Sequence, residues 1–147
     1  CSSCAEIYGL RYCALRISDT YGPRDKRTNA VNNFLSAAKS SSTINISGSG
    51  NQRRSYTYVK DIATVIAKII VVPCTNEVFN VTSDEATSIA ELACLIQKTM
   101  CPTLNIINDI NAGDTRDYVF SVDKLLAQIG AMEWTPLEEG LKATYSG

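Results

Sequence analysis

Segments with the two-residue period of a strand alternate along this chain with segments that have the 3.6-residue period of a helix. Apolar residues recur at i, i+3, i+4 and i+7 from Val31 to Ala38, which predicts a helix over residues 30–39. Residues 43–47 alternate apolar and polar side chains as a strand does. Because strands that alternate with helices are typical of α/β proteins, the order predicts an α/β fold of short strands and helices.

The other predicted elements follow the same two patterns, and residues that cap helices mark several of their starts. Asp61 is expected to cap a helix, and Ser88 with Glu91 and Thr135 with Glu138 have the spacing of capping boxes. Residues 43–47 and 55–59 are expected to be two strands joined by a connection too long for a tight hairpin. Further strands are expected at 11–18, 77–81 and 104–107, and further helices at 62–71, 89–98, 122–129 and 136–144.

Length and charge limit what the chain can be and bind. Its 147 residues predict a single domain over 1–147. Fourteen basic and fifteen acidic residues give a net charge of −1, so bulk charge offers no attraction to nucleic acid or to an anionic membrane. The longest apolar run, 62–72, is interrupted by Thr64 and Lys68 and is too short to span a bilayer. We therefore expect neither nucleic acid nor a membrane as a partner.

The absence of histidine and the scatter of the cysteines narrow the chemistry. Without histidine, His-ligated metal sites and Ser-His-Asp or Cys-His catalysis are excluded. Cys1 and Cys4 form a lone C-x-x-C without the second pair that a zinc site needs, so no metal is expected. Cys13 and Cys94 lie in apolar periodic segments, where cysteine behaves as a small buried hydrophobe. With no visible signal peptide, these features predict a cytoplasmic protein with reduced cysteines.

Four stretches, in this order, carry a resemblance to a known family. They are residues 15–24 (LRISDTYGPR), 46–63 (ISGSGNQRRSYTYVKDIA), 78–81 (VFNV) with 88–92 (SIAEL), and 113–117 (GDTRD) with 134–141 (WTPLEEGL). They resemble the C-terminal half of the extended short-chain dehydrogenase/reductases, the NAD-dependent nucleotide-sugar epimerases and dehydratases. The resemblance implies a Rossmann-like fold, and the matching half is the one that binds the nucleotide sugar.

Two motifs of that family are missing from their places. One is its glycine-rich turn, whose backbone N–H groups approach the dinucleotide pyrophosphate at a helix N-terminus. The other is its Tyr-x-x-x-Lys, which in the family lies shortly before the element matched here by residues 8–10 (YGL). The resemblance therefore implies a truncated, catalytically incomplete half. NAD belongs to the parent family, and no cofactor is expected on this chain alone.

The resemblance also implies a set of substrate-binding residues. Arg54 matches the arginine that clamps the nucleotide diphosphate, since a guanidinium pairs bidentately with phosphate oxygens. Arg116 is the expected second phosphate contact. For both, the alternative is a surface role: a solvated side chain for Arg54, and an ion pair with Asp114 or Asp117 for Arg116.

Three further residues are candidates for the same site. Asp19 stands where the family has Asn, and an ionised Asp accepts hydrogen bonds but donates none and repels a diphosphate. Arg24 closes the YGPR motif, with an ion pair to Asp25 or Asp19 as its alternative. Asn33 lies on the helix that lines the nucleotide-base pocket in the family, with a solvent-facing position as its alternative.

Three functions remain open. The first is the nucleotide-diphosphate-sugar-binding portion of an epimerase/dehydratase-like protein, inactive alone. The second is a stand-alone module that binds a nucleotide sugar without turnover, and the third is a degenerate oligomeric scaffold without ligand. The expected partners are a nucleotide-diphosphate sugar together with either a second copy of the chain or the missing N-terminal half.

Overall fold

The computed structural model describes residues 2–73, 76–109 and 116–147. Within them the chain forms helices and strands in alternation, as the sequence predicts. The helices are α1 (Ser2–Tyr8), α2 (Ala30–Lys39), α3 (Val59–Val71), α4 (Ile89–Met100), α5 (Asp123–Ile129) and α6 (Leu137–Ser146). The strands are β1 (Cys13–Ile17), β2 (Thr20–Tyr21), β3 (Thr43–Ser47), β4 (Arg53–Arg54), β5 (Thr57–Tyr58), β6 (Glu77–Val81), β7 (Thr87–Ser88) and β8 (Asn105–Asp109).

The strands pair two by two. β1 runs parallel to β6, β2 to β5 and β3 to β8, whereas β4 and β7 are antiparallel. The parallel pairs join strands that are far apart in sequence, with Cys13 opposite Glu77 and Thr43 opposite Asn105. Helices lie in the connections between these parallel strands, as such crossovers require. The α/β fold class is confirmed.

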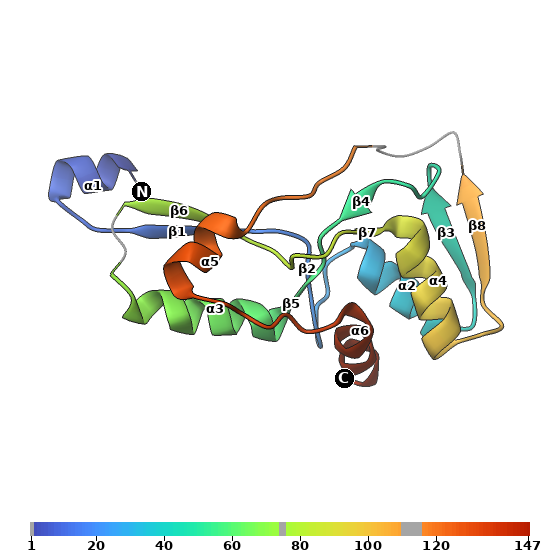
Figure 1. Ribbon diagram of the computed structural model, residues 1–147. Helices are drawn as coiled ribbons and strands as arrows, with labels where there is room; N and C mark the ends of the chain where they lie inside the picture. The colour runs from blue at the N-terminus through green and yellow to red at the C-terminus, as the bar shows by residue number, and fades with distance from the viewer. Residues whose placement is uncertain (1, 74–75, 110–115) are drawn as a thin grey trace.

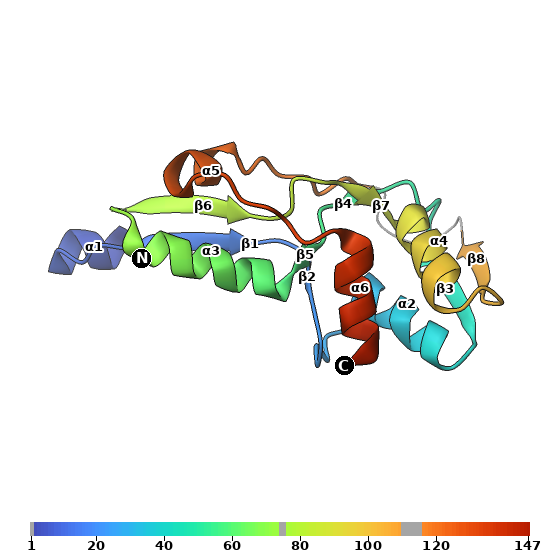
Figure 2. The same cartoon turned by 60° about the horizontal axis from the view of Figure 1, so that its bottom comes forward.

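The elements gather at two ends of an elongated molecule (Figure 1). The β1–β6 pair lies at one end with α3 and α5, and α1 projects beyond it in both views (Figure 2). The β3–β8 pair lies at the other end with α2 and α4. The short β2–β5 pair and α6 lie between the two ends, so the segments that connect them meet at the centre of the molecule.

Each end has its own apolar cluster. The larger one joins the buried faces of α2, α4 and α6 to β3, and includes Tyr21, Tyr56 and Tyr58 from the centre of the molecule. The smaller one joins α3, β6 and α5 through buried residues such as Val65 and Leu125. Of the tyrosines in the larger cluster, Tyr56 also lines the cavity described below.

Strong local patterns gave the most accurate boundaries. The predicted bounds of α2, β3 and β6 match those observed. The capping box that opens α4 is confirmed, because the Ser88 N–H donates to Glu91 Oε2 at 2.7 Å and the Glu91 N–H donates to Ser88 Oγ at 3.1 Å. Gly130 ends α5 with φ 79°, a left-handed conformation that glycine adopts without strain.

Other local expectations are wrong. Of residues 55–59 only β5 is a strand, Val59 already begins α3, and β3 and β5 pair with β8 and β2 instead of forming a pair. Asp61 lies inside the first turn of α3, whose N-cap is Tyr58. Thr135 does not cap α6 either, because its hydroxyl donates to Asp61 Oδ1 at 2.7 Å and α6 begins after Pro136 without a side-chain cap. Asp61 and Thr135 were each expected to cap a helix, and instead they form a hydrogen bond with each other.

Two findings bear on the cysteines and on membranes. The cysteines at 4, 13, 94 and 101 are free thiols. Cys94 is exposed, which corrects the expectation that it is a buried hydrophobe, because α4 turns its other face to the core. Within the described ranges, no helix is long and apolar enough to cross a bilayer.

Gly140 lets α6 pass directly over Tyr21, and we expect Gly140→Ala to destabilise the fold. A Cβ at this position would overlap the Tyr21 hydroxyl and lie 2.9 Å from Tyr21 Cζ. Tyr21 is only 1% exposed, and its ring packs against the Tyr58 ring. Overpacking of this kind costs about 1–3 kcal/mol, more than the helix propensity that alanine adds. Chemical denaturation should therefore show a lower free energy of unfolding for Gly140→Ala.

Adding Tyr21→Phe to Gly140→Ala removes the Tyr21 hydroxyl, the atom nearest to the new Cβ, and should recover part of the lost stability. A gain in stability from Gly140→Ala would contradict the close contact.

Candidate functional site

A cavity of about 810 Å³ opens at the centre of the molecule, where the two ends meet. One wall is the turn after β1, with Ser18 and Asp19, and another is the start of α2, with Asn29 and Val31. Arg54 lies on the wall formed by β4. Polar groups from segments far apart in sequence therefore converge on one hollow, as ligand sites in proteins do.

Arg54 is the less exposed of the two arginines that line this cavity. Its side chain is 16% exposed, and its Nε lies 3.8 Å from Asp19 Oδ2. Its Nη1 donates to the backbone carbonyls of Arg53 and Arg116. A guanidinium keeps its charge at any ordinary pH and offers a planar fork of N–H donors, so this arrangement suits a phosphate group.

Segment 116–118 is fixed against β4 by one backbone–backbone hydrogen bond and one hydrogen bond from the β4 backbone to a side chain. The Arg53 N–H donates to Asp117 Oδ1 at 2.7 Å, and the Tyr118 N–H donates to the Arg53 carbonyl at 3.0 Å. β4 is itself paired with β7, opposite Ser88 and Thr87. This pairing places the Arg54 side chain next to a segment more than 60 residues further along the chain.

Tyr118 brings the two predicted phosphate-binding arginines together. The Arg54 guanidinium carbon lies 4.3 Å from the centre of the Tyr118 ring, and that of Arg116 lies 5.6 Å from the same ring. Cations are attracted to aromatic faces at such distances. Tyr118 was missed by the sequence analysis, although an aromatic residue two positions after Arg116 was a signal available there.

Asp19 faces Arg54 across the mouth of the cavity. Its side chain is 45% exposed. Burial raises the pKa of the Asp19 carboxyl above its usual range, and the nearby guanidiniums of Arg54 and Arg27 oppose that rise. Its backbone carbonyl accepts from the Thr57 N–H at 3.1 Å, which ties the turn to β5. The carboxylate is therefore held beside Arg54.

Arg27 also lines this cavity, and the sequence analysis did not single it out. Its Nε and Nη2 donate to both carboxylate oxygens of Asp25 at 2.9 Å, and Nη2 donates to the Thr20 carbonyl at 2.7 Å. The Arg27 guanidinium beside it holds the pKa of the Asp25 carboxyl well below its usual range. Arg27 is therefore a second fixed cation near Asp19.

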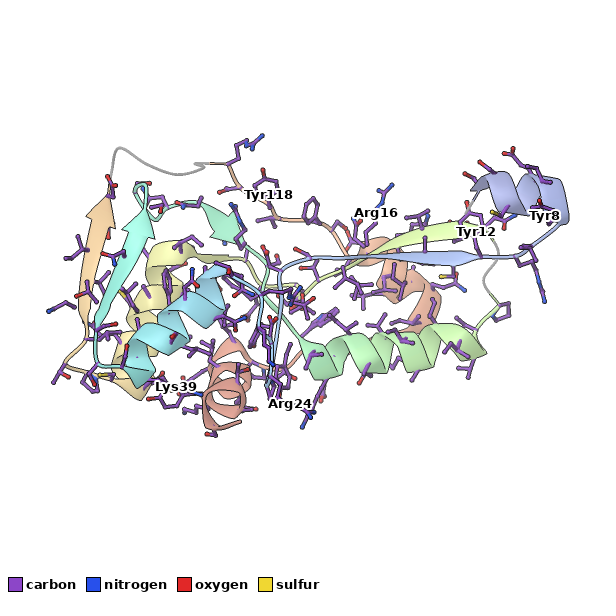
Figure 3. The ribbon with its side chains drawn as sticks, turned by 180° about the vertical axis from the view of Figure 1, so that it is seen from behind. Tyr8, Tyr12, Arg16, Arg24, Lys39 and Tyr118 are labelled. Carbon is purple, nitrogen blue, oxygen red and sulfur yellow. The ribbon has the colours of Figure 1, made fainter. Side chains whose placement is uncertain are left out.

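Arg24 and Asn33 do not reach this cavity. Arg24 has φ 65° and lines a separate hollow with Lys39, and Figure 3 shows Arg24 and Tyr118 at opposite edges of the molecule. Asn33 lines another surface hollow with Ser36 on α2. Of the five predicted site residues, Asp19 and Arg54 line this cavity, and Arg116 lies next to Arg54 against the Tyr118 ring without lining the cavity. Residues 110–115, which include Asn111, Ala112 and the start of GDTRD, lie outside the described residues.

Tyr56 offers the cavity a buried hydroxyl. Tyr56 is 7% exposed, and its OH has no hydrogen-bond partner within the described part of the chain. Burial, with the nearby Asp19 carboxylate, raises the pKa of Tyr56 above its usual range, so the phenol stays protonated and can donate. Tyr56 and Lys60 do spell Tyr-x-x-x-Lys, but Tyr56 precedes β5 and Lys60 is exposed in α3, so the two do not share a helix face.

The described residues do not fit the dinucleotide NAD. A pyrophosphate needs free backbone N–H groups at a glycine-rich turn that opens a helix. No such turn opens α2, α3, α4, α5 or α6, and the first turns of α2 and α4 are occupied by the side chains of Asn29 and Ser88. Nor do the described residues include three or more acidic or cysteine side chains placed to hold a metal ion.

Comparison with known proteins finds a matching family and relatives that are named as nucleotide-sugar enzymes. The NAD dependent epimerase/dehydratase family model matches residues 1–82, more than half of the chain. The trifunctional UDP-glucose 4,6-dehydratase/epimerase/reductase of Arabidopsis thaliana is 27% identical over 93% of this chain and 21% of its own length. The dTDP-D-glucose 4,6-dehydratase of Mus musculus is 26% identical over 95% of this chain and 41% of its own length.

Two solved structures of nucleotide-sugar epimerases have the same fold as this chain. A UDP-glucose 4-epimerase of Thermotoga maritima, crystallised with UDP-glucose, superposes with a TM-score of 0.86 and is 27% identical over 99% of this chain and 48% of its own. A UDP-glucuronic acid 4-epimerase of Bacillus cereus, in complex with UDP-glucuronic acid and NAD, has the same fold at a TM-score of 0.85, with 21% identity over 99% of this chain and 48% of its own. The chain thus spans less than half the length of these relatives.

Proposed function

This chain belongs to the NAD dependent epimerase/dehydratase family, and we propose that it is the portion that binds a nucleotide-diphosphate sugar, with Arg54 as the clamp for the diphosphate. The observation that carries this proposal is the position of Arg54 on the wall of the central cavity, with Arg116 against the same Tyr118 ring that Arg54 contacts. The cavity volume of about 810 Å³ is in the range of small-molecule sites.

Each described group has a role in that binding. Arg54 donates bidentately to one phosphate, and Arg116, which lies against the same Tyr118 ring, adds a second positive charge near that anion. The Tyr56 hydroxyl donates to an oxygen of the ligand, because it is buried beside the cavity and unpaired among the described residues. The 147 residues act as one substrate-binding unit in this proposal.

The described residues do not supply the groups that carry out the hydride transfer of the family. In that chemistry bound NAD takes up a hydride from the sugar and returns it. Here Tyr56 and Tyr21 stay protonated, since burial raises the pKa of both above the usual range, so neither serves as a general base. We propose that the chain alone binds no NAD and is inactive, and that it resides in the cytoplasm with reduced cysteines.

Calorimetric titration tests this function. The 147-residue chain should bind UDP-glucose and UDP, bind UMP more weakly because one phosphate is missing, and leave free glucose unbound. With NAD added it should produce neither an epimerised nor a dehydrated sugar. Absence of binding to every nucleotide would favour a scaffold without ligand, and turnover by the pure chain would contradict the proposed inactivity.

The surface around α1 and β1 should join two copies of the isolated chain. No residue of α1 is buried, and Leu10 and Ile17 are 56% and 47% exposed, whereas Tyr12 and Ala14 are half-buried. Among the described strands β1 pairs only with β6, so its other edge offers unpaired backbone groups to a second copy. Figure 3 shows Tyr8, Tyr12 and Arg16 along this end of the molecule.

Sedimentation at micromolar concentration measures this association. We expect a dimer or higher oligomer, and Leu10→Glu should shift it toward monomer. Ile107→Glu is the matched control, because Ile107 is also 56% exposed but lies on β8 at the opposite end. A monomer with amides protected from exchange along β1 would contradict the prediction.

A further inference from the structure

Asp19 is a carboxylate placed where an anionic ligand would have to bind. It lines the central cavity together with Arg54, and its Oδ2 lies 3.8 Å from Arg54 Nε. The guanidinium that would hold a diphosphate is thus already paired with an acid of the same chain. An ionised carboxylate accepts hydrogen bonds and donates none, so it gives nothing to a phosphate oxygen.

We propose that Asp19 competes with the diphosphate of the ligand for the guanidinium of Arg54 and thereby sets the affinity of the site. This inference rests on the proposed function, since it takes Arg54 as the diphosphate clamp. The existing ion pair is long and partly exposed, so separating it costs little. The larger effect arises once the diphosphate is bound, because Asp19 and the ligand then share one guanidinium, and the repulsion between them acts only while Arg54 holds the ligand beside Asp19.

The surroundings of Asp19 make this competition depend on pH. The charged groups that face it are Arg54 on β4 and Arg27, whose own charge is balanced by Asp25, and the neutral phenol of Tyr56 lies nearby. Burial outweighs these cations and raises the pKa of Asp19. As the pH falls through that raised pKa the carboxyl becomes neutral, releases Arg54 and no longer repels the ligand, so affinity should increase.

Asp19→Asn isolates the effect, because it removes the charge and keeps the shape. With UDP-glucose as the probe in calorimetry, we expect binding to tighten about tenfold, equivalent to 1.4 kcal/mol. Asp84→Asn is the matched control: it removes one negative charge from an exposed carboxylate in a different hollow and should leave the affinity unchanged. Equal tightening by Asp84→Asn would reveal an effect of net charge and overturn the proposal.

A double-mutant cycle with Arg54→Ala separates competition from long-range repulsion. If Asp19 acts through Arg54, the gain from Asp19→Asn disappears in the Arg54→Ala background. A gain of the same size in that background overturns the competition. Binding that depends on Arg54 but does not tighten in Asp19→Asn also overturns it, and leaves the proposed function standing. If Arg54→Ala leaves the affinity for UDP-glucose unchanged, or if no variant binds it, the diphosphate clamp and this inference are overturned together.

Proton uptake gives a second readout. The UDP-glucose diphosphate is a diester and has no group that titrates near neutral or mildly acidic pH. Since ligand and proton binding are linked, wild-type protein should take up protons on binding near the pKa of Asp19, and its affinity should increase as the pH falls. Calorimetry in buffers of different ionisation enthalpy measures this uptake, and Asp19→Asn should abolish it. Equal uptake by both proteins would overturn the pH dependence.

Discussion

Arg54→Ala should remove most of the binding of UDP-glucose, with a loss of about 2–5 kcal/mol in binding free energy, the range measured when a desolvated charge loses its partner. The Arg54 side chain is only 16% exposed, and its guanidinium is held by Tyr118 and by two backbone carbonyls. A cation held in this way binds a phosphate without first losing side-chain freedom. Isothermal titration calorimetry with UDP-glucose measures the change.

Arg53→Ala is the control, because it removes the same charge from the adjacent residue. Arg53 is exposed, and its Nη2 donates to the Ala86 carbonyl at 2.8 Å. We expect little change in affinity from this substitution. Arg54→Lys keeps the charge but loses the planar fork, so its loss should be intermediate. Equal losses from Arg53→Ala and Arg54→Ala would mean that the clamp has been assigned to the wrong residue or does not exist.

The sequence could predict those elements whose start, end and buried face are encoded locally. α2 and β3 have clear periods of 3.6 and 2 residues, and Ser88 and Glu91 cap α4 through neighbours three residues apart. The two-residue strands have no such pattern. β2 and β4 exist because Thr20 lies opposite Thr57 and Arg53 lies opposite Ser88, and neither pairing has a signal within a short window of sequence.

The same distinction between local and long-range signals explains which residues of the site could be predicted. Arg54 and Asp19 could be proposed because the motifs around them resemble those of a known family. Tyr118 was missed because its place is set by the distant β4 backbone, and Arg27 was missed because its pairing with the neighbouring Asp25 and the Thr20 carbonyl does not reveal that it lines the cavity. Arg24 stands only five residues from Asp19, yet the left-handed backbone there carries it to another hollow.

Asp61 shows how a local pattern can be correct about residue type and wrong about role. An acidic residue before an apolar helical stretch is typical of an N-cap. In the structure Asp61 is 6% exposed inside α3, and it accepts from the Thr135 N–H at 3.0 Å and from the Thr135 hydroxyl at 2.7 Å. It therefore joins α3 to the segment that leads into α6. That segment carries Trp134, which packs against the cluster formed by α3, β6 and α5.

Asp61→Ala should lower the free energy of unfolding by about 2–4 kcal/mol, because it removes two hydrogen bonds to a buried charge and leaves the Thr135 donors without an acceptor. Asp61→Asn retains one acceptor oxygen and should lose less. Asp84→Ala, at an exposed carboxylate, should change stability by less than about 0.5 kcal/mol. Chemical denaturation followed by tryptophan fluorescence measures all three, since Trp134 is the only tryptophan and lies next to Thr135. If Asp61→Ala were as harmless as Asp84→Ala, the hydrogen bonds to Thr135 could not be what attaches the segment before α6 to α3, and the apolar contacts of Trp134 would have to hold that segment alone.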